Sequence, residues 1–202
     1  FFFDRTSPGA LDLARYFKQE GCIVFFEPSA KGNLNHMQEA LSLADIVKYS
    51  DQRFSLSPLT KGQAHRPFLE IKTLGDRGLE YRLNLDNNWQ SLKAFQASRV
   101  RDTSGCGDWT TAGIISKLCL NGKSSLESLS RHNVEHSLRY GQALGTWNCQ
   151  FEGARGGMYQ VDQHTFFAEI EQILQNKNRK SNDLMFEPSS SKAIAKICPD
   201  CL

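Results

Sequence analysis

A glycine-containing loop over residues 102–108 has the residue types and spacing that most strongly suggest chemistry. It has the sequence Asp-Thr-Ser-Gly-Cys-Gly-Asp and lies directly before a long helical pattern over 109–120. The first N–H groups of a helix have no acceptor within that helix, and the helix dipole favours negative charge beside them. Because Gly105 and Gly107 have no side chain, a phosphate can approach these N–H groups closely. The loop therefore predicts an anion site.

Asp108 places a carboxylate at the mouth of this predicted anion site. A carboxylate repels phosphate, so it is unexpected in a loop that only binds phosphate. It is explained if Asp108 accepts a proton from a substrate hydroxyl while the loop neutralises a phosphoryl group in transfer. The alternative is structural: Asp108 caps the helix or stabilises its first turn, which is worth about 1 kcal/mol.

Helices and apolar strands alternate along the chain and must position this loop. Ser7 and Pro8 are typical of a helix start, and this helix is expected to end at Gly21. Its apolar face is expected to comprise Ala10, Leu13, Ala14 and Phe17. Further helices are predicted over 35–44, 125–148 and 163–175, the second interrupted by Gly141 and Gly145. Strands are predicted over 22–26, 45–49, 68–74 and 79–85. The alternation predicts an α/β fold: a Rossmann-like, doubly wound, mostly parallel sheet with helices on both faces, and an active site at the carboxyl ends of its strands.

The two ends of the chain differ from its middle. The sequence opens Phe-Phe-Phe-Asp without a Met or a signal-peptide pattern, so we interpret it as the remaining part of a longer chain. Another strand of the same sheet is expected before Phe1. From residue 176 the composition turns to Asn, Lys, Ser and Pro. One domain is therefore expected over 1–175, followed by a polar tail over 176–202.

Composition excludes several classes of protein. The 202 residues are 40% hydrophobic and 23% charged, which is typical of a globular chain. The formal net charge of +2 gives no basic field for nucleic acid. The longest internal apolar run, over 22–26, is far shorter than a membrane span. The six cysteines are scattered without the density of a disulfide scaffold, so a cytoplasmic location is expected.

Four segments together resemble one known family. The loop and the residues after it, over 102–113, resemble the signature D-T-x-G-A-G-D-x-F-x-x-G of the ribokinase-like (PfkB) carbohydrate kinases. The segment over 72–78 resembles the T-x-G-x-x-G turn of that family. The segment over 44–48 resembles its A-D-I strand, and the segment over 27–31 resembles its D-P-N-x-R. The four occur in the order of the family, so the resemblance implies its fold, with an N-terminal part absent.

The resemblance also implies a role for each matching residue. Asp108 would be the catalytic base, and the backbone N–H groups of Gly105, Cys106 and Gly107 would line the anion hole. Asp102 and Thr103 would lie near a loop that supports a monovalent cation or a phosphate. Thr73, Gly75 and Gly78 would line the phosphates of the nucleotide. ATP would be the phosphoryl donor, with Mg²⁺ bridging its phosphate oxygens.

Two departures from the family pattern bear on function. Cys106 replaces the usual alanine, and the metal-associated N-x-x-E falls on residues 50–53, where Arg53 stands in place of the glutamate and Asp51 is the nearest acid. No residue is assigned to a metal. The expected function is ATP-dependent phosphorylation of a hydroxyl on a small sugar or sugar-like molecule, and homodimerisation is left open. The alternatives are a catalytically inactive nucleotide- or sugar-binding regulatory module and a nucleoside kinase of the same fold.

Other patterns favour chemistry less. Gly122-Lys123-Ser124 resembles the end of a P-loop, but the required earlier glycine is Lys117, and the triplet is expected to end a helix. His132 and His136, which could pair with a cysteine nucleophile, lie in a polar stretch that favours a solvated face.

The remaining cysteines and one arginine have simpler interpretations. Cys198 and Cys201 form a single CxxC, which lacks the second ligand pair of a zinc site. Cys149 is expected to pack in the core. Arg155, in a glycine-rich segment, is expected either to contact a phosphate or to be solvated.

Overall fold

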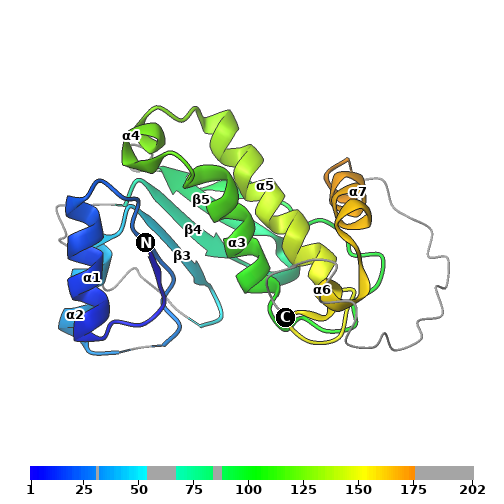
Figure 1. The fold of residues 1–202 in the computed structure, drawn as a ribbon, viewed down its shortest axis with the longest axis horizontal. Helices are drawn as coiled ribbons and strands as arrows, with labels where there is room; N and C mark the ends of the chain where they lie inside the picture. Colours follow the sequence, from blue (N-terminus) through cyan, green and yellow to red (C-terminus); the bar gives the residue numbers. More distant parts are fainter. Residues whose placement is uncertain (31, 54–66, 84–87, 176–202) are drawn as a thin grey trace. The chain divides into compact units, whose positions relative to one another are not determined.

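The computed structural model describes residues 1–30, 32–53, 67–83 and 88–175 (Figure 1). The described chain divides into two compact units. Unit 1 holds Phe1–Ala94 and Cys119–Leu129, and unit 2 holds Phe95–Leu118 and the chain from Ser130 onward. The predicted polar tail and its Cys198 and Cys201 lie outside the described residues.

Unit 1 is built on one sheet of six strands in chain order. The strands are β1 (Phe2–Phe3), β2 (Phe25–Phe26), β3 (Ile46–Ser50), β4 (Leu69–Thr73), β5 (Leu79–Leu83) and β6 (Gln90–Leu92). The pairs from β1 to β4 are parallel, and β4–β5 and β5–β6 are antiparallel. Three of five strand pairs are therefore parallel, and the predicted α/β class with a mostly parallel sheet is confirmed.

Helices α1 (Pro8–Gln19) and α2 (Leu34–Leu43) connect the first three strands. Ser7 caps α1 as predicted, because its Oγ accepts the N–H of Ala10 at 3.3 Å. The predicted apolar face is partly wrong: Leu11 and Ala14 are buried, whereas Leu13 is 50% exposed. The helix is rotated so that Leu11 joins the cluster formed by Phe3, Phe26 and Val47.

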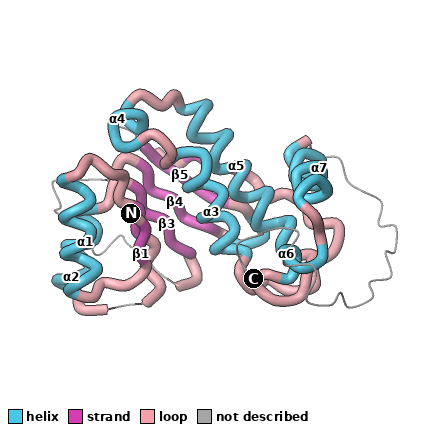
Figure 2. Tube along the Cα trace, in the orientation of Figure 1, coloured by secondary structure: helices cyan, strands magenta, loops and turns pink. Residues whose placement is uncertain are grey.

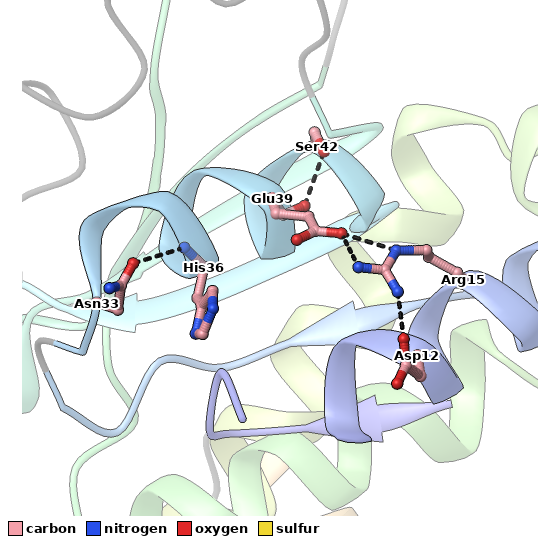
Figure 3. A network of polar contacts seen from close by, with 6 residues as sticks. All are labelled: Asp12, Arg15, Asn33, His36, Glu39 and Ser42. Atoms are coloured by element: carbon pink, nitrogen blue, oxygen red, sulfur yellow. Dashed lines mark hydrogen bonds and ion pairs between the residues drawn. The ribbon is translucent and has the colours of Figure 1, made fainter. Parts of the chain in front are cut away.

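A polar network joins α1 to α2 at the surface (Figure 3). Arg15 on α1 donates from Nε to Glu39 on α2 at 2.7 Å and also pairs with Asp12. Asn33 caps α2 by accepting the N–H of His36 at 3.2 Å. The network therefore fixes how two neighbouring helices of unit 1 lie against each other.

Unit 2 is helical. It contains α3 (Cys106–Leu118), α5 (Arg131–Asn148), α6 (Gly156–Gln160) and α7 (Gln163–Leu174). Helices α3 and α5 lie side by side (Figures 1 and 2), and their backbones approach each other closely at glycines. A Cβ at Gly141 would lie 2.6 Å from the carbonyl oxygen of Thr110, and one at Gly113 would lie 2.7 Å from the Cα of Gly141. The close packing of α3 on α5 therefore requires glycine at both positions.

Three predictions over 119–148 are wrong. The single helix expected over 125–148 is two helices, α4 (Gly122–Glu127) in unit 1 and α5 in unit 2. Gly122 begins α4 with a φ of 72° and does not end a helix. The glycines at 141 and 145 do not interrupt α5, because contact with α3 offsets their weak helix propensity.

Among the described residues, no helix is both long and apolar enough to pass through a bilayer.

Candidate active site

The helix predicted after the loop is α3, but it begins at Cys106 and not at residue 109, so residues 106–108 form its first turn. Gly105 has a φ of 74°, a conformation that side chains rarely adopt. A Cβ there would also lie 2.7 Å from the Cβ of Ala154. Both the backbone conformation and the space available therefore require glycine at this point of the loop.

Asp102 holds the loop in shape. Its Oδ1 accepts the N–H of Ser104 at 2.8 Å, and its Oδ2 accepts the N–H of Gly153 at 2.9 Å. The hydrogen bond from Ser104 is the main cause that lowers the pKa of Asp102, and the one from Gly153 adds to it. Both oxygens thus act on the backbone, and Asp102 positions the loop.

Helix α5 supports the loop from its C-terminal end. Asn148 is fully buried and donates from Nδ2 to the carbonyl oxygen of Ser104 at 2.8 Å. The carbonyl oxygen of Cys149 accepts the N–H of Arg101 at 2.8 Å and that of Asp102 at 3.3 Å. Residues some 40 positions later in the chain therefore fix both sides of the loop.

One of the three backbone N–H groups predicted to line the anion site, that of Cys106, already has a hydrogen-bond acceptor in the loop. The N–H of Cys106 donates to the carbonyl oxygen of Thr103 at 3.2 Å, whereas Gly107 lies in the exposed first turn of α3. Asp108 is exposed in the same turn. The arrangement can therefore present backbone N–H groups and a carboxylate from one helix turn to a ligand in solvent.

Trp109 anchors the start of α3. Its Nε1 donates to the carbonyl oxygen of Ala154 at 2.8 Å, and its ring lies 5.3 Å from that of Trp147. These contacts keep the residue after Asp108 in place, so the direction of the first helix turn is well defined.

The predicted nucleotide turn lies in unit 1, between β4 and β5. Thr73 pairs with Leu79 at the end of the ladder, and the N–H of Leu74 donates to Gly78 O at 2.8 Å. Gly78 has a φ of 103°, and a Cβ there would lie 2.1 Å from the carbonyl oxygen of Leu92. The turn is therefore held by backbone contacts and permits only glycine at this position.

Asp51, the acid nearest to the expected glutamate, lies beside this turn. Its N–H donates to Thr73 O at 3.0 Å, and its Oδ2 pairs with Arg77 at 2.5 Å. Its Oδ1 is buried and has no hydrogen-bond partner among the described residues. Arg53 is exposed. In the described part of the chain, no three His, Cys, Asp or Glu residues cluster as a metal site.

The predicted site residues fall into two groups. Unit 1 brings together Thr73, Gly75 and Gly78, and unit 2 brings together Asp102, Thr103, Gly105, Cys106, Gly107 and Asp108. His132 and His136 are exposed on α5, as expected for a solvated face.

Comparison with solved structures identifies the fold. Fructokinase from Xylella fastidiosa, solved with bound ATP, superposes with a TM-score of 0.65 and 18% identity over 84% of this chain and 57% of that chain. A fructokinase double mutant from Vibrio cholerae, bound to fructose, ADP and potassium, gives a TM-score of 0.62 and 18% identity over 80% of this chain and 54% of that chain. The nucleoside kinase of Burkholderia thailandensis, in complex with inosine, superposes with a TM-score of 0.59 and 17% identity over 82% of this chain and 52% of that chain.

The chain has the ribokinase-like fold. It spans a little more than half the length of these kinases. Neither a protein-family model nor a curated protein sequence matches it.

Within this ribokinase-like fold, the supports of the loop were missing from the sequence-based prediction. Asn148, Gly153 and Ala154 contact the loop from positions more than 40 residues away. The sequence contains one indirect signal: Gly141 and Gly145 are four residues apart and lie about two turns and one turn before Asn148. That spacing is typical of close helix packing, and the structure confirms it because a Cβ at Gly145 would lie 2.8 Å from Cys106 O.

Proposed function

We propose that the chain is the nucleotide-binding and catalytic portion of an ATP-dependent kinase of the ribokinase-like (PfkB) family, which phosphorylates a hydroxyl of a sugar or sugar-like molecule. The single observation that supports this most is the exposed Asp108 in the first turn of α3, directly after a loop that only glycine at 105 can form. The similarity of the fold to sugar and nucleoside kinases is consistent with it.

In the proposed reaction, Asp108 accepts the proton of the acceptor hydroxyl as the oxygen attacks the terminal phosphorus of ATP. The bond from that phosphorus to the bridging oxygen breaks, and ADP leaves. Asp108 suits this role because it is exposed, so a substrate can reach it, and because its helix turn is fixed through Trp109.

The N–H groups of the loop stabilise the negative charge of the transferring group. The N–H of Gly107 lies at the start of α3, where the helix dipole adds to its effect. The N–H of Cys106 can join it only by leaving Thr103 O, to which it donates here. Asp102 serves the reaction indirectly, because it holds the loop through Ser104 and Gly153.

On the nucleotide side, Thr73, Gly75 and Gly78 would line the phosphates of ATP, as the family resemblance implies. When bound, Mg²⁺ offsets charge on the phosphate oxygens. Asp51, beside this turn, would be able to hold such an ion, since its Oδ1 is buried without a partner among the described residues, although Arg77 already offsets its charge. Each carboxylate oxygen of Asp102 accepts one backbone N–H group and keeps a further lone pair, so Asp102 would still be able to hold a monovalent cation near the loop.

The test is phosphoryl transfer from Mg-ATP to a panel of sugars and nucleosides by the full-length protein. Asp108→Asn should lower kcat by about 10³-fold or more, because the general base is lost, and should leave nucleotide affinity nearly unchanged. Glu152→Gln, which neutralises another exposed acid of unit 2, is the matched control and should keep full turnover. Equal turnover of wild type and Asp108→Asn would contradict the role of Asp108.

A second candidate is a binding or regulatory module of the same fold that does not transfer phosphate. It is favoured by the pairing of Asp51 with Arg77 and by Arg53 in place of the expected glutamate. Nucleotide binding without transfer to any acceptor in the panel would favour this candidate.

A further inference from the structure

Two cysteines meet where α5 supports the loop. The backbone of Cys106 contacts α5 at Gly145, since a Cβ on Gly145 would lie 2.8 Å from Cys106 O. The Sγ of Cys106 lies 4.0 Å from Nδ2 of Asn148, the residue before Cys149. Both cysteines are half-buried free thiols. A small molecule can therefore reach a pair of thiols that stand between the loop and the end of α5.

The side chain of Cys106 lowers the pKa of Cys149, and the side chain of Cys149, together with burial, raises the pKa of Cys106. Removal of one proton from the pair is favoured because the remaining S–H stabilises the thiolate. A thiolate is the reactive form of cysteine, so the pair contains both a nucleophile and a second thiol that can resolve its oxidised product.

We propose that Cys106 and Cys149 form a reversible disulfide that holds the loop over 102–108 in a form unable to transfer phosphate efficiently. The bond would join the first residue of α3 to the residue that ends α5. Cys149 already holds the start of the loop, because its carbonyl oxygen accepts the N–H groups of Arg101 and Asp102. The disulfide would therefore close the loop at both of its ends.

The effect on catalysis follows from the N–H of Cys106 and rests on the proposed function. That N–H donates to Thr103 O, and it must turn away from Thr103 to reach a phosphoryl group. A bond from Cys106 to α5 opposes this movement. Displacement of a catalytic group by about 1 Å can cost about 100-fold in rate, so a loss of that size is expected.

The oxidant is a small peroxide. The thiolate of Cys149 attacks one peroxide oxygen, the O–O bond breaks, and water leaves after protonation, which gives a sulfenic acid on Cys149. The thiol of Cys106 then attacks the sulfur of Cys149, so that an S–S bond forms and the S–O bond breaks. The hydroxyl of the sulfenic acid takes up the proton of the Cys106 thiol and leaves as a second water. A dithiol reductant reverses the step by thiol exchange.

The test combines peptide mapping with activity after treatment of the full-length protein with hydrogen peroxide. Trypsin releases Cys106 in the peptide over 102–117 and Cys149 in the peptide over 140–155, each with a single cysteine. Cys198 and Cys201 share another peptide, over 197–202, so a bond between them is distinguished. We expect the peptides over 102–117 and 140–155 to be linked, the turnover to fall about 100-fold, and dithiothreitol to restore both.

Variants separate this bond from general oxidation. Cys149→Ala and Cys149→Ser should keep turnover in peroxide, and either serves if the other folds poorly. Cys119→Ala, which removes another half-buried free thiol, should behave like wild type. Unlinked peptides, or a linked chain with undiminished turnover, would overturn the proposal. If no form of the protein transfers phosphate, the proposed function and the proposed effect on rate both fail, while the peptide map still decides whether the bond forms.

Discussion

The two glycine-containing segments of the candidate site are held by different means. The turn over 74–78 in unit 1 is fixed by backbone: it closes the β4–β5 ladder, and Gly78 lies against the backbone of Leu92. The loop over 102–108 in unit 2 is fixed largely by side chains, those of Asp102 and Asn148. A segment held by backbone depends on the integrity of the sheet. One held by side chains responds to pH and to chemical change at a few residues.

Between these two segments, the largest expected effect is on activity and concerns Gly105. Gly105→Ala adds a Cβ that meets Ala154 at 2.7 Å, so the loop must shift and its N–H groups move away from the phosphoryl group. Turnover should fall by about 100-fold or more, as for the loss of one anion-hole donor. Steady-state kinetics with Mg-ATP measures this.

Gly153→Ala is the matched control for that experiment. Gly153 also has a positive φ, of 77°, but a Cβ there meets nothing within 4 Å. The Gly153→Ala variant therefore adds backbone strain without a steric clash such as that between Gly105→Ala and Ala154, and it should keep most of the activity. Equal losses in the two variants would show that strain, and not contact with Ala154, determines the form of the loop.

The next effect is on stability and concerns the turn in unit 1. Gly78→Ala places a Cβ 2.1 Å from a backbone oxygen, so it should lower the free energy of unfolding by more than about 2 kcal/mol. Gly75→Ala, in the same turn, has a positive φ but open space and should cost only about 1 kcal/mol. Urea denaturation of the two variants measures the difference. Similar midpoints would contradict control of this turn by the backbone at Leu92.

The smallest effect is the pH dependence of the loop. The folded chain lowers the pKa of Asp102, so the ionised form stabilises the fold above the ordinary aspartate pKa of about 3.9, and this stabilisation is lost as pH falls through the lowered value. Asp102→Asn should be less stable than wild type near pH 7, and the gap should narrow in acid. Urea midpoints measured across this range test it, with Glu152→Gln as the control that shows a smaller change. A gap that widens in acid would reverse the assigned sign.

The sequence predicted the elements that depend on local signals. Ser7 as a cap and the turn between the strands over 68–74 and 79–85 follow from residues close to each other in the chain, and the helix after the loop was predicted only three residues too late. Predictions were wrong where distant contacts decide. Helix α5 continues through Gly141 because α3 packs on it, which periodicity alone does not indicate.

The same distinction holds for the candidate site. The loop and Asp108 were predicted from their own sequence and from a family resemblance. The roles of Asn148 and Ala154 depend on chain segments that only the fold brings together. The pairing of Cys106 with Cys149 could not be predicted either, because 43 positions separate the two thiols.

The three tryptophans give each unit its own optical signal. Trp109 directly follows Asp108, and its indole N–H is bonded to Ala154 O, so its fluorescence depends on the state of the loop. Trp89 in unit 1 lies against two cations, with its ring centre 4.9 Å from Nζ of Lys72 and 4.8 Å from the guanidinium carbon of Arg82. The cations beside Trp89 and the carbonyl contact of Trp109 should quench the fluorescence of these two residues to different degrees. Variants that keep a single tryptophan can therefore report ligand binding in one unit without an added label.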